Sequence, residues 1–160
     1  MTRNLLYILF VFLCLSACKT KNAFKYSQDF VTKEKTLLPF IEITENKVAA
    51  FIDEEKYDSV TIVAAQMETR IKNLVDSIKA APAPEAAQGE KFKIDVIKYF
   101  EFMQSVYTSY KNYGSAGSNE VRDIEIEKLQ QIVAKKESVT TTIQTAQRSF
   151  AKANGIEIEK

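Results

Sequence analysis

Residues 60–80 read VTIVAAQMETRIKNLVDSIKA, and this stretch has the most regular apolar pattern in the chain. Its apolar side chains recur in steps of four, three, four, three and four residues, at Val60, Ala64, Met67, Ile71, Leu74 and Ile78. Such steps place side chains on one face of an α-helix, because the helix repeats about every 3.6 residues. The stretch therefore predicts an amphipathic helix from about Asp58 to Ala80, which must bury its apolar stripe against other elements.

A second helix of the same kind follows in the sequence. Residues 81–89 read APAPEAAQG, and two prolines and a glycine in so short a stretch predict a loop. From about Glu90 to Tyr113 the apolar stripe resumes at helical spacing, at Phe92, Val96, Phe100, Met103, Tyr107 and Tyr110. Because the connection is short, the two helices are expected to pack as antiparallel neighbours.

Two further helical segments flank this hairpin. One is predicted over residues 119–153, capped by Ser118 or Asn119 and ended by Asn154-Gly155. Its stripe consists of Val121, Ile124, Ile132, Val139, Ile143, Ala146 and Phe150. The other is predicted over residues 23–52, with a kink or a break near residues 36–39, because Pro39 costs about 3 kcal/mol inside a helix.

These four segments predict an all-α protein of one domain over residues 23–160, an antiparallel up-down-up-down four-helix bundle. A chain of 160 residues is long enough to bury a core without disulfides or metals. The alternative is a three-helix bundle with a broken, partly detached first segment.

The first seventeen residues have a different character. Arg3 supplies a positive charge, residues 5–15 form the unbroken apolar run LLYILFVFLCL, and Ser16 and Ala17 are small. Eleven residues are too few to span about 30 Å of hydrocarbon as an ordinary helix. Charge, apolar run and small residues in this order are typical of a secretory signal peptide.

The end of this segment is more specific. Leu15-Ser16-Ala17-Cys18 resembles the bacterial lipobox, Leu-[Ala/Ser]-[Gly/Ala]-Cys. The resemblance implies that Cys18 carries a diacylglycerol, that cleavage removes residues 1–17, and that the new amino group is acylated, for example by palmitate. Residues 18–22 are then a lipidated tether. The alternatives are a plain secretory signal and an uncleaved anchor.

The lipobox also implies a place in the cell. The protein is expected in the cell envelope, held to a membrane by lipid on Cys18, since two or more acyl chains anchor a protein stably. Residue 19 is Lys rather than the Asp that marks inner-membrane retention in enterobacteria-like systems, which favours the outer membrane. With Cys14 removed and Cys18 lipidated, an internal disulfide is excluded.

The order of lipobox, long helical hairpin and aromatic helix resembles the uncharacterised small helical lipoproteins of Bacteroidetes and spirochaetes. The resemblance covers residues 23–153 as a pattern, without a specific motif there. It implies no activity, cofactor or catalytic residue.

Composition narrows the function further. The chain has no histidine, which removes the usual acid/base group and the commonest metal ligand. After loss of Arg3 the mature chain has 21 basic and 21 acidic residues, interspersed and without the basic stripe that nucleic acids need. We therefore expect no enzyme, cofactor, metal site or nucleic-acid partner, although a hydrolase using two carboxylates is the third alternative.

The aromatic helix supplies the candidate contact residues. Tyr99, Phe102 and Tyr113 lie off the apolar stripe, so they are candidates for contact with a ligand or a protein partner. Core packing is the competing interpretation of the aromatic residues in this helix.

We expect a non-enzymatic lipoprotein that serves as a protein-interaction or structural module, with an envelope protein as partner. The alternative is a module that binds a glycan or lipid between the third and fourth helices, using the aromatic residues of the third.

Overall fold

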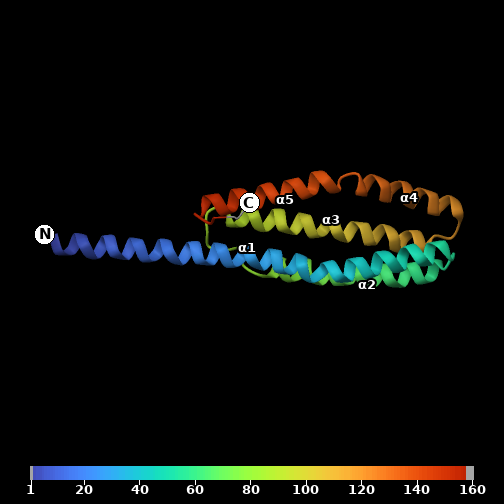
Figure 1. Cartoon of the computed structure of the whole chain (residues 1–160), viewed down its shortest axis with the longest axis horizontal. Coiled ribbons are helices and arrows are strands. Elements are labelled where there is room, and N and C mark those ends of the chain that lie inside the picture. The colour runs from blue at the N-terminus through green and yellow to red at the C-terminus, as the bar shows by residue number, and fades with distance from the viewer. Residues whose placement is uncertain (1, 158–160) are drawn as a thin grey trace.

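The protein is entirely helical in the part of the chain that the structure describes. This computed structural model describes the backbone of residues 2–157 and the side chains of residues 20–157. Five helices and no strand occur there: α1 (Thr2–Asp53), α2 (Tyr57–Ala80), α3 (Gly89–Ser115), α4 (Asn119–Val133) and α5 (Lys136–Ala153). The helices lie along one long axis, with α4 and α5 end to end (Figure 1). The predicted all-α class is confirmed.

The α2–α3 hairpin forms as its sequence predicts. Every residue of the predicted α2 stripe is buried except Leu74, which is half-buried beside the buried Val75. On α3 the buried positions include Phe92, Val96, Phe100 and Tyr107. Helix α2 begins at Tyr57, one residue before the predicted start, and the side chain of Lys56, which precedes it, makes no capping hydrogen bond.

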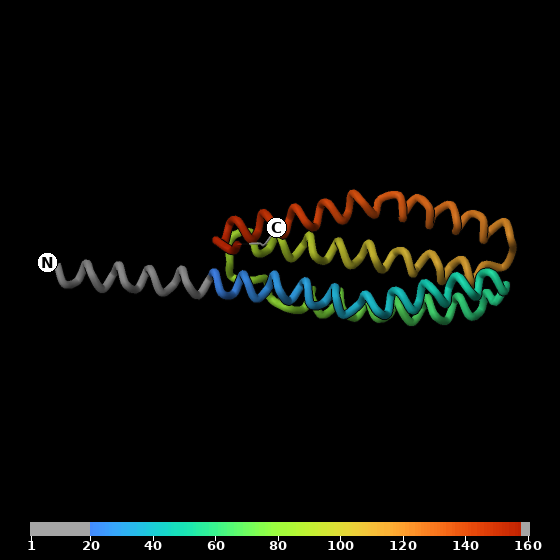
Figure 2. Tube along the Cα trace, in the orientation of Figure 1, coloured from blue at the N-terminus to red at the C-terminus, as the bar shows by residue number. Residues whose placement is uncertain are grey.

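Helix α3 is the centre of the molecule, because it packs against each of the other four helices. Phe92 of α3 stacks on Phe150 of α5 with ring centroids 4.6 Å apart, and Phe30 of α1 meets Phe92 edge-on at 6.0 Å. Such aromatic pairs contribute about 0.5–1.5 kcal/mol beyond the burial of their area. These rings hold α1 and α5 on α3. In Figure 2 the coloured part of α1 lies alongside the other helices.

Helix α1 has no break at Pro39, contrary to one of the two outcomes expected for it. The helix continues from Thr2 to Asp53 with Pro39 inside it. Leu38, Pro39 and Phe40 are all exposed. The backbone carbonyl that loses its hydrogen bond to proline therefore has access to water, and Leu37 and Val48 are buried on either side of it.

The fourth predicted helix, residues 119–153, is wrong as a single element. It is divided into α4 and α5 by a turn at Ala134 and Lys135. All six side chains from Val133 to Ser138 are exposed. Without an inward-facing apolar side chain, this stretch gains nothing from packing that would keep the helix straight.

The predicted stripe is also wrong in α4. Val121 and Ile124 are 44 % and 51 % exposed, while Glu125 is buried. The guanidinium of Arg122 lies 3.8 Å from the ring centre of Tyr57, and Ile126 packs on the Val48–Val60–Tyr113 cluster. These two contacts set the inward face of α4 and turn Val121 and Ile124 toward solvent. In α5 the predicted Ile143, Ala146 and Phe150 are buried.

The end of α3 approaches the start of α2 very closely. A methyl group on Gly114 would lie 2.5 Å from Thr61 Oγ1 and 2.6 Å from the carbonyl oxygen of Tyr57. A glycine is therefore required here for the two backbones to meet. Gly117, in the following loop, has no atom within 4 Å of the same position.

Gly114→Ala is expected to lower the free energy of unfolding by about 1–3 kcal/mol, because the added methyl must push α2 and α3 apart. Gly117→Ala is the matched control and should be neutral or slightly stabilising. Thermal and urea unfolding followed by circular dichroism measure both. Equal stability of the two variants would contradict the close approach.

A polar network joins the middle of the same two helices. Glu68 of α2 accepts hydrogen bonds from Thr108 at 2.7 Å and from Lys111 at 2.5 Å, both on α3. Partial burial alone would raise the pKa of the Glu68 carboxyl, but these hydrogen bonds and the charge of Lys111 outweigh it and hold that pKa below its usual value. The ionised carboxylate therefore stabilises the α2–α3 pair.

Glu68→Gln is expected to lower the free energy of unfolding by about 1–2 kcal/mol at pH 7. Because the folded-state pKa is depressed, the contribution of Glu68 is complete above its unfolded pKa of about 4.3 and is lost as the pH falls through the folded value. The difference from wild type should therefore shrink below about pH 4. Urea unfolding across pH 3–7 measures it, with the exposed Glu127→Gln as control, and a deficit independent of pH would refute this role.

Candidate functional site

The predicted lipidation site, Cys18, and the predicted signal peptide lie outside the residues whose side chains are described. The side chains are described from Thr20 onward. Residues 20–22, predicted to belong to a tether, are part of α1, and Ala23 is fully buried in the core. In the described part of the chain, no helix has an apolar stretch of the length needed to cross a membrane.

Tyr99, the first candidate contact residue, is bound into the core. Its ring meets Phe30 at 5.8 Å and Phe100 at 5.4 Å, both edge-on, and its hydroxyl donates a hydrogen bond to the carboxylate of Glu34. Burial raises the pKa of Tyr99, and the hydrogen bond and charge of Glu34 raise it further. The side chain therefore joins α3 to α1.

The other two candidates lie in different surroundings. Tyr113 is buried against Val48 and Val60, and its ring meets that of Tyr57 at 5.8 Å. Phe102 is half-buried and belongs to neither of the two core clusters. The structure thus does not bring Tyr99, Phe102 and Tyr113 together, as a shared patch or as the lining of one cleft.

Tyr99→Phe is expected to lower the free energy of unfolding by about 1 kcal/mol through loss of the Glu34 hydrogen bond. Tyr99→Ala should cost about 3 kcal/mol, because the ring contacts are lost as well. Thermal unfolding distinguishes the two. If both variants were as stable as wild type, Tyr99 would be a free surface side chain, available to a partner.

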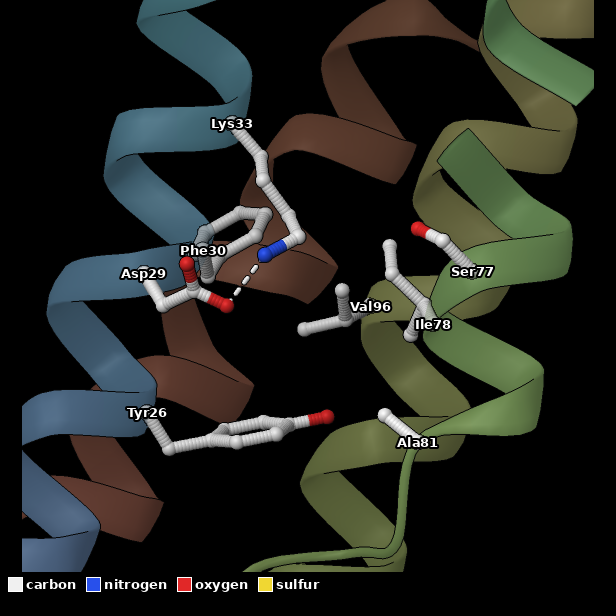
Figure 3. Close-up of a pocket in the computed structure, with 8 residues that line it drawn as sticks. All are labelled: Tyr26, Asp29, Phe30, Lys33, Ser77, Ile78, Ala81 and Val96. Atoms are coloured by element: carbon white, nitrogen blue, oxygen red, sulfur yellow. Dashed lines mark hydrogen bonds and ion pairs between the residues drawn. The ribbon is translucent and has the colours of Figure 1, made fainter. Parts of the chain in front are cut away.

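A concave site does exist, but between α1, α2 and α3. It is a cleft of about 270 Å³. Its walls are formed by Tyr26, Asp29, Phe30 and Lys33 on α1 and by Ser77, Ile78 and Ala81 at the end of α2, with Val96 of α3 between them (Figure 3). Ile78 and Val96 are 5 % and 2 % exposed, so the cleft reaches the core.

The cleft exists because the end of α2 presents small side chains to α1. Ser77 and Ala81 are four residues apart and cannot fill the space that a branched or aromatic side chain would occupy. The wall is held in place from α3, where the Lys93 ammonium donates to the carbonyl oxygens of Lys79 at 3.0 Å and Ala81 at 2.5 Å. The last turn of α2 is therefore fixed rather than free to collapse.

The polar groups of the cleft are few, and all except the Ser77 hydroxyl lie on its α1 side. The ring of Tyr26 is fixed edge-on against Phe92 and Phe150, and its hydroxyl points across the cleft toward Ala81 (Figure 3). Burial raises the pKa of Tyr26 to about 12, with the carboxylates of Asp29 and Glu90 adding to the effect. The hydroxyl is therefore protonated, and a hydrogen-bond donor, at any physiological pH.

Lys33 is the charged donor of the cleft. It forms an ion pair with Asp29, four residues earlier on α1. The side chain of Lys33 is 27 % exposed and that of Asp29 is 53 % exposed, so the cation is the deeper of the two. An ammonium has three N–H groups, and the pair with Asp29 leaves others for a ligand.

This arrangement suits binding rather than acid/base chemistry. Among residues 20–157, no group of three or more acidic or cysteine side chains is placed to hold a metal ion. The cleft offers apolar walls, the phenol of Tyr26, the ammonium of Lys33 with its partner Asp29, and the hydroxyl of Ser77. Such a site can hold an apolar molecule by its length and orient it by one polar end.

Sequence reasoning missed this site. Tyr26, Asp29, Phe30 and Lys33 stand at positions i, i+3, i+4 and i+7, which share one face of a helix. Of these four residues only Phe30 fits an apolar stripe. The mixture of polar and apolar side chains on one helix face was the only local sign of a binding site. The partner wall depends on how α1 lies beside the small residues of α2, which no local pattern contains.

Comparisons of the chain with models of known protein families, with curated proteins and with solved structures found no match.

Proposed function

We propose that the chain is the precursor of a lipid-anchored envelope protein, cleaved before Cys18, whose helical domain is a non-enzymatic interaction or structural module. The observation that carries the proposal is the sequence of Arg3, the apolar run 5–15 and Leu15-Ser16-Ala17-Cys18. Each part is required for export and lipidation, and the three stand in the required order. The presence of Lys19 favours the outer membrane.

The domain proposed for this role is an antiparallel up-down-up-down four-helix bundle in which α4 and α5 together make the fourth helix. Two observations support this topology. The α1–α2 and α3–α4 connections lie at one end of the molecule, and the α2–α3 loop and the end of α5 lie at the other (Figure 1). At that second end, the side-chain amide of Asn154 makes two hydrogen bonds with the backbone of Ala87, at 3.0 and 2.9 Å.

The position of the core supports an anchor close to the bundle. Ala23 is buried only five residues after Cys18, which corresponds to about 8 Å of helix. A lipid on Cys18 would therefore hold the end of the bundle that contains the α2–α3 loop near the membrane surface. The opposite end and the flanks of α1 and α4 would face an envelope partner.

Cys18→Ser is expected to abolish lipidation, because serine lacks the thiol that receives the diacylglycerol. Expressed in a bacterial host, the wild type should lose residues 1–17 and enter the detergent phase on Triton X-114 partitioning, while Cys18→Ser should remain uncleaved at that bond and unlipidated. Immunoblotting of the phases and intact mass measure the two effects.

Cys14→Ser is the matched control for this experiment. Cys14 lies in the apolar run and is removed with the signal peptide, so its substitution should leave cleavage and partitioning unchanged. An unlipidated, aqueous-phase wild type would overturn the proposal. Loss of lipidation in both variants would show an effect of cysteine number rather than of the lipobox.

A further inference from the structure

The cleft between α1, α2 and α3 has the size of a short chain molecule. At roughly 30 Å³ for each water-sized group, about 270 Å³ accommodates about nine such groups. This is slightly less than the range of about 300–1,000 Å³ in which drug-sized ligands bind. The cleft therefore has room for about eight to ten heavy atoms of a ligand.

The walls determine the chemistry of most of that ligand. Phe30, Ile78 and Val96 present carbon only, and the ring of Tyr26 adds an aromatic face. A sugar would leave most of its hydroxyl groups without partners against such walls, at a cost of about 1–3 kcal/mol each. A hydrocarbon chain leaves none, because it needs only apolar contact.

The polar end of the cleft determines the head of the ligand. The Tyr26 hydroxyl and the Lys33 ammonium are donors, and the hydroxyl of Ser77 already donates to the carbonyl oxygen of Leu74 at 2.7 Å. The carboxylate of Asp29 already accepts from Lys33. The Tyr26 hydroxyl and the remaining N–H groups of Lys33 can donate to an oxygen acceptor on the ligand. The Asp29 carboxylate keeps unused acceptor positions, but its negative charge is offset by the ion pair with Lys33.

We propose that this cleft binds a fatty acyl group and holds about eight to ten of its heavy atoms, with its carboxylate or ester oxygens directed to Tyr26 and Lys33. The site does not depend on the lipid at Cys18, and it is separate from the aromatic residues Tyr99, Phe102 and Tyr113. The ligand chemistry is the same whether the chain belongs to a free fatty acid or to a membrane lipid.

Photolabelling with decanoic acid that carries a terminal diazirine tests the proposal. The sample is the protein expressed from the complete gene in a bacterial host and purified in mild detergent after any processing by the host. The expected result is label in the peptides that contain residues 26–33 and 77–81, removed by excess decanoate. Label spread over the exposed apolar residues Phe24, Leu38 and Ile43, without competition by decanoate, would overturn the site.

Ala81→Trp provides the blocking variant. Ala81 is exposed and has an extended backbone, with φ −70° and ψ 144°, so a large side chain is tolerated there. The indole should occupy the cleft and reduce its labelling about tenfold. Ala80→Trp, at a neighbouring exposed residue that does not line the cleft, is the control and should label as wild type does. Unchanged labelling of Ala81→Trp would contradict the proposal.

The assignment of the head group is tested by competition. Decanoate should displace the probe at about tenfold lower concentration than decylamine, which has the same chain and a cationic head. Lys33→Gln should remove this difference, and Lys35→Gln, exposed on the same helix, should preserve it. Equal or better competition by decylamine in the wild type would refute an oxygen-bearing head. A mass measurement of the same samples reports lipidation of Cys18 separately, so failure of the anchor is distinguishable from failure of the cleft.

Discussion

The structure depends on the stack of Phe92 on Phe150 and on the edge-on rings of Tyr26 and Phe30 around it. An amphipathic helix is only marginally stable in water by itself, so each helix of this protein needs a partner for its apolar stripe. Helices α2 and α3 are joined by a short loop and bury their apolar stripes against each other. The aromatic cluster is what attaches α1, from the start of the chain, and α5, from its end, to that pair. The α2–α3 loop is held at the same place by Asn154.

The same cluster creates the cleft. It positions Tyr26 and Phe30 on one side. On the other side α2 places the small Ser77 and Ala81 beside Ile78, so the space between the helices is not filled. The last turn of α2 is fixed by Lys93 and does not collapse into the gap. A site for an apolar chain thus arises at the end of the bundle nearest to Cys18, where a lipid-anchored protein would meet membrane lipid.

The sequence predicted those parts of the fold that repeat along one helix face. The α2 and α3 stripes, the Ser118 cap and the stop at Asn154-Gly155 follow from local patterns, and Ser118 does accept a hydrogen bond from the Val121 amide. The rotation of α4 depends on contacts with Tyr57 and with the Val48 cluster, which are distant in sequence. The turn at Ala134-Lys135 lies in a stretch whose side chains are all exposed. Tyr99 lies off the α3 stripe yet is packed, because α1 covers a second face of α3 that a single stripe does not reveal.

The candidate functional residues also differ in whether a local sequence pattern predicts them. Lipidation of Cys18 is predicted from a short linear motif, and it stays a prediction because Cys18 lies outside the residues whose side chains are described. The cleft could not be predicted from the sequence, because each of its walls is an ordinary helix face and the cleft forms only when the helices pack side by side. Phe102 remains a candidate contact from sequence alone, half-buried and outside both core clusters.

Mass spectrometry of the N-terminal peptide of the mature protein tests the central claim most directly. Digestion after Lys19 should yield a dipeptide of Cys18 and Lys19 that carries a thioether-linked diacylglycerol. That result would establish both the cleavage site and the anchor beside a bundle whose core begins at Ala23. A peptide that begins before Cys18, or an unmodified Cys18, would contradict the account.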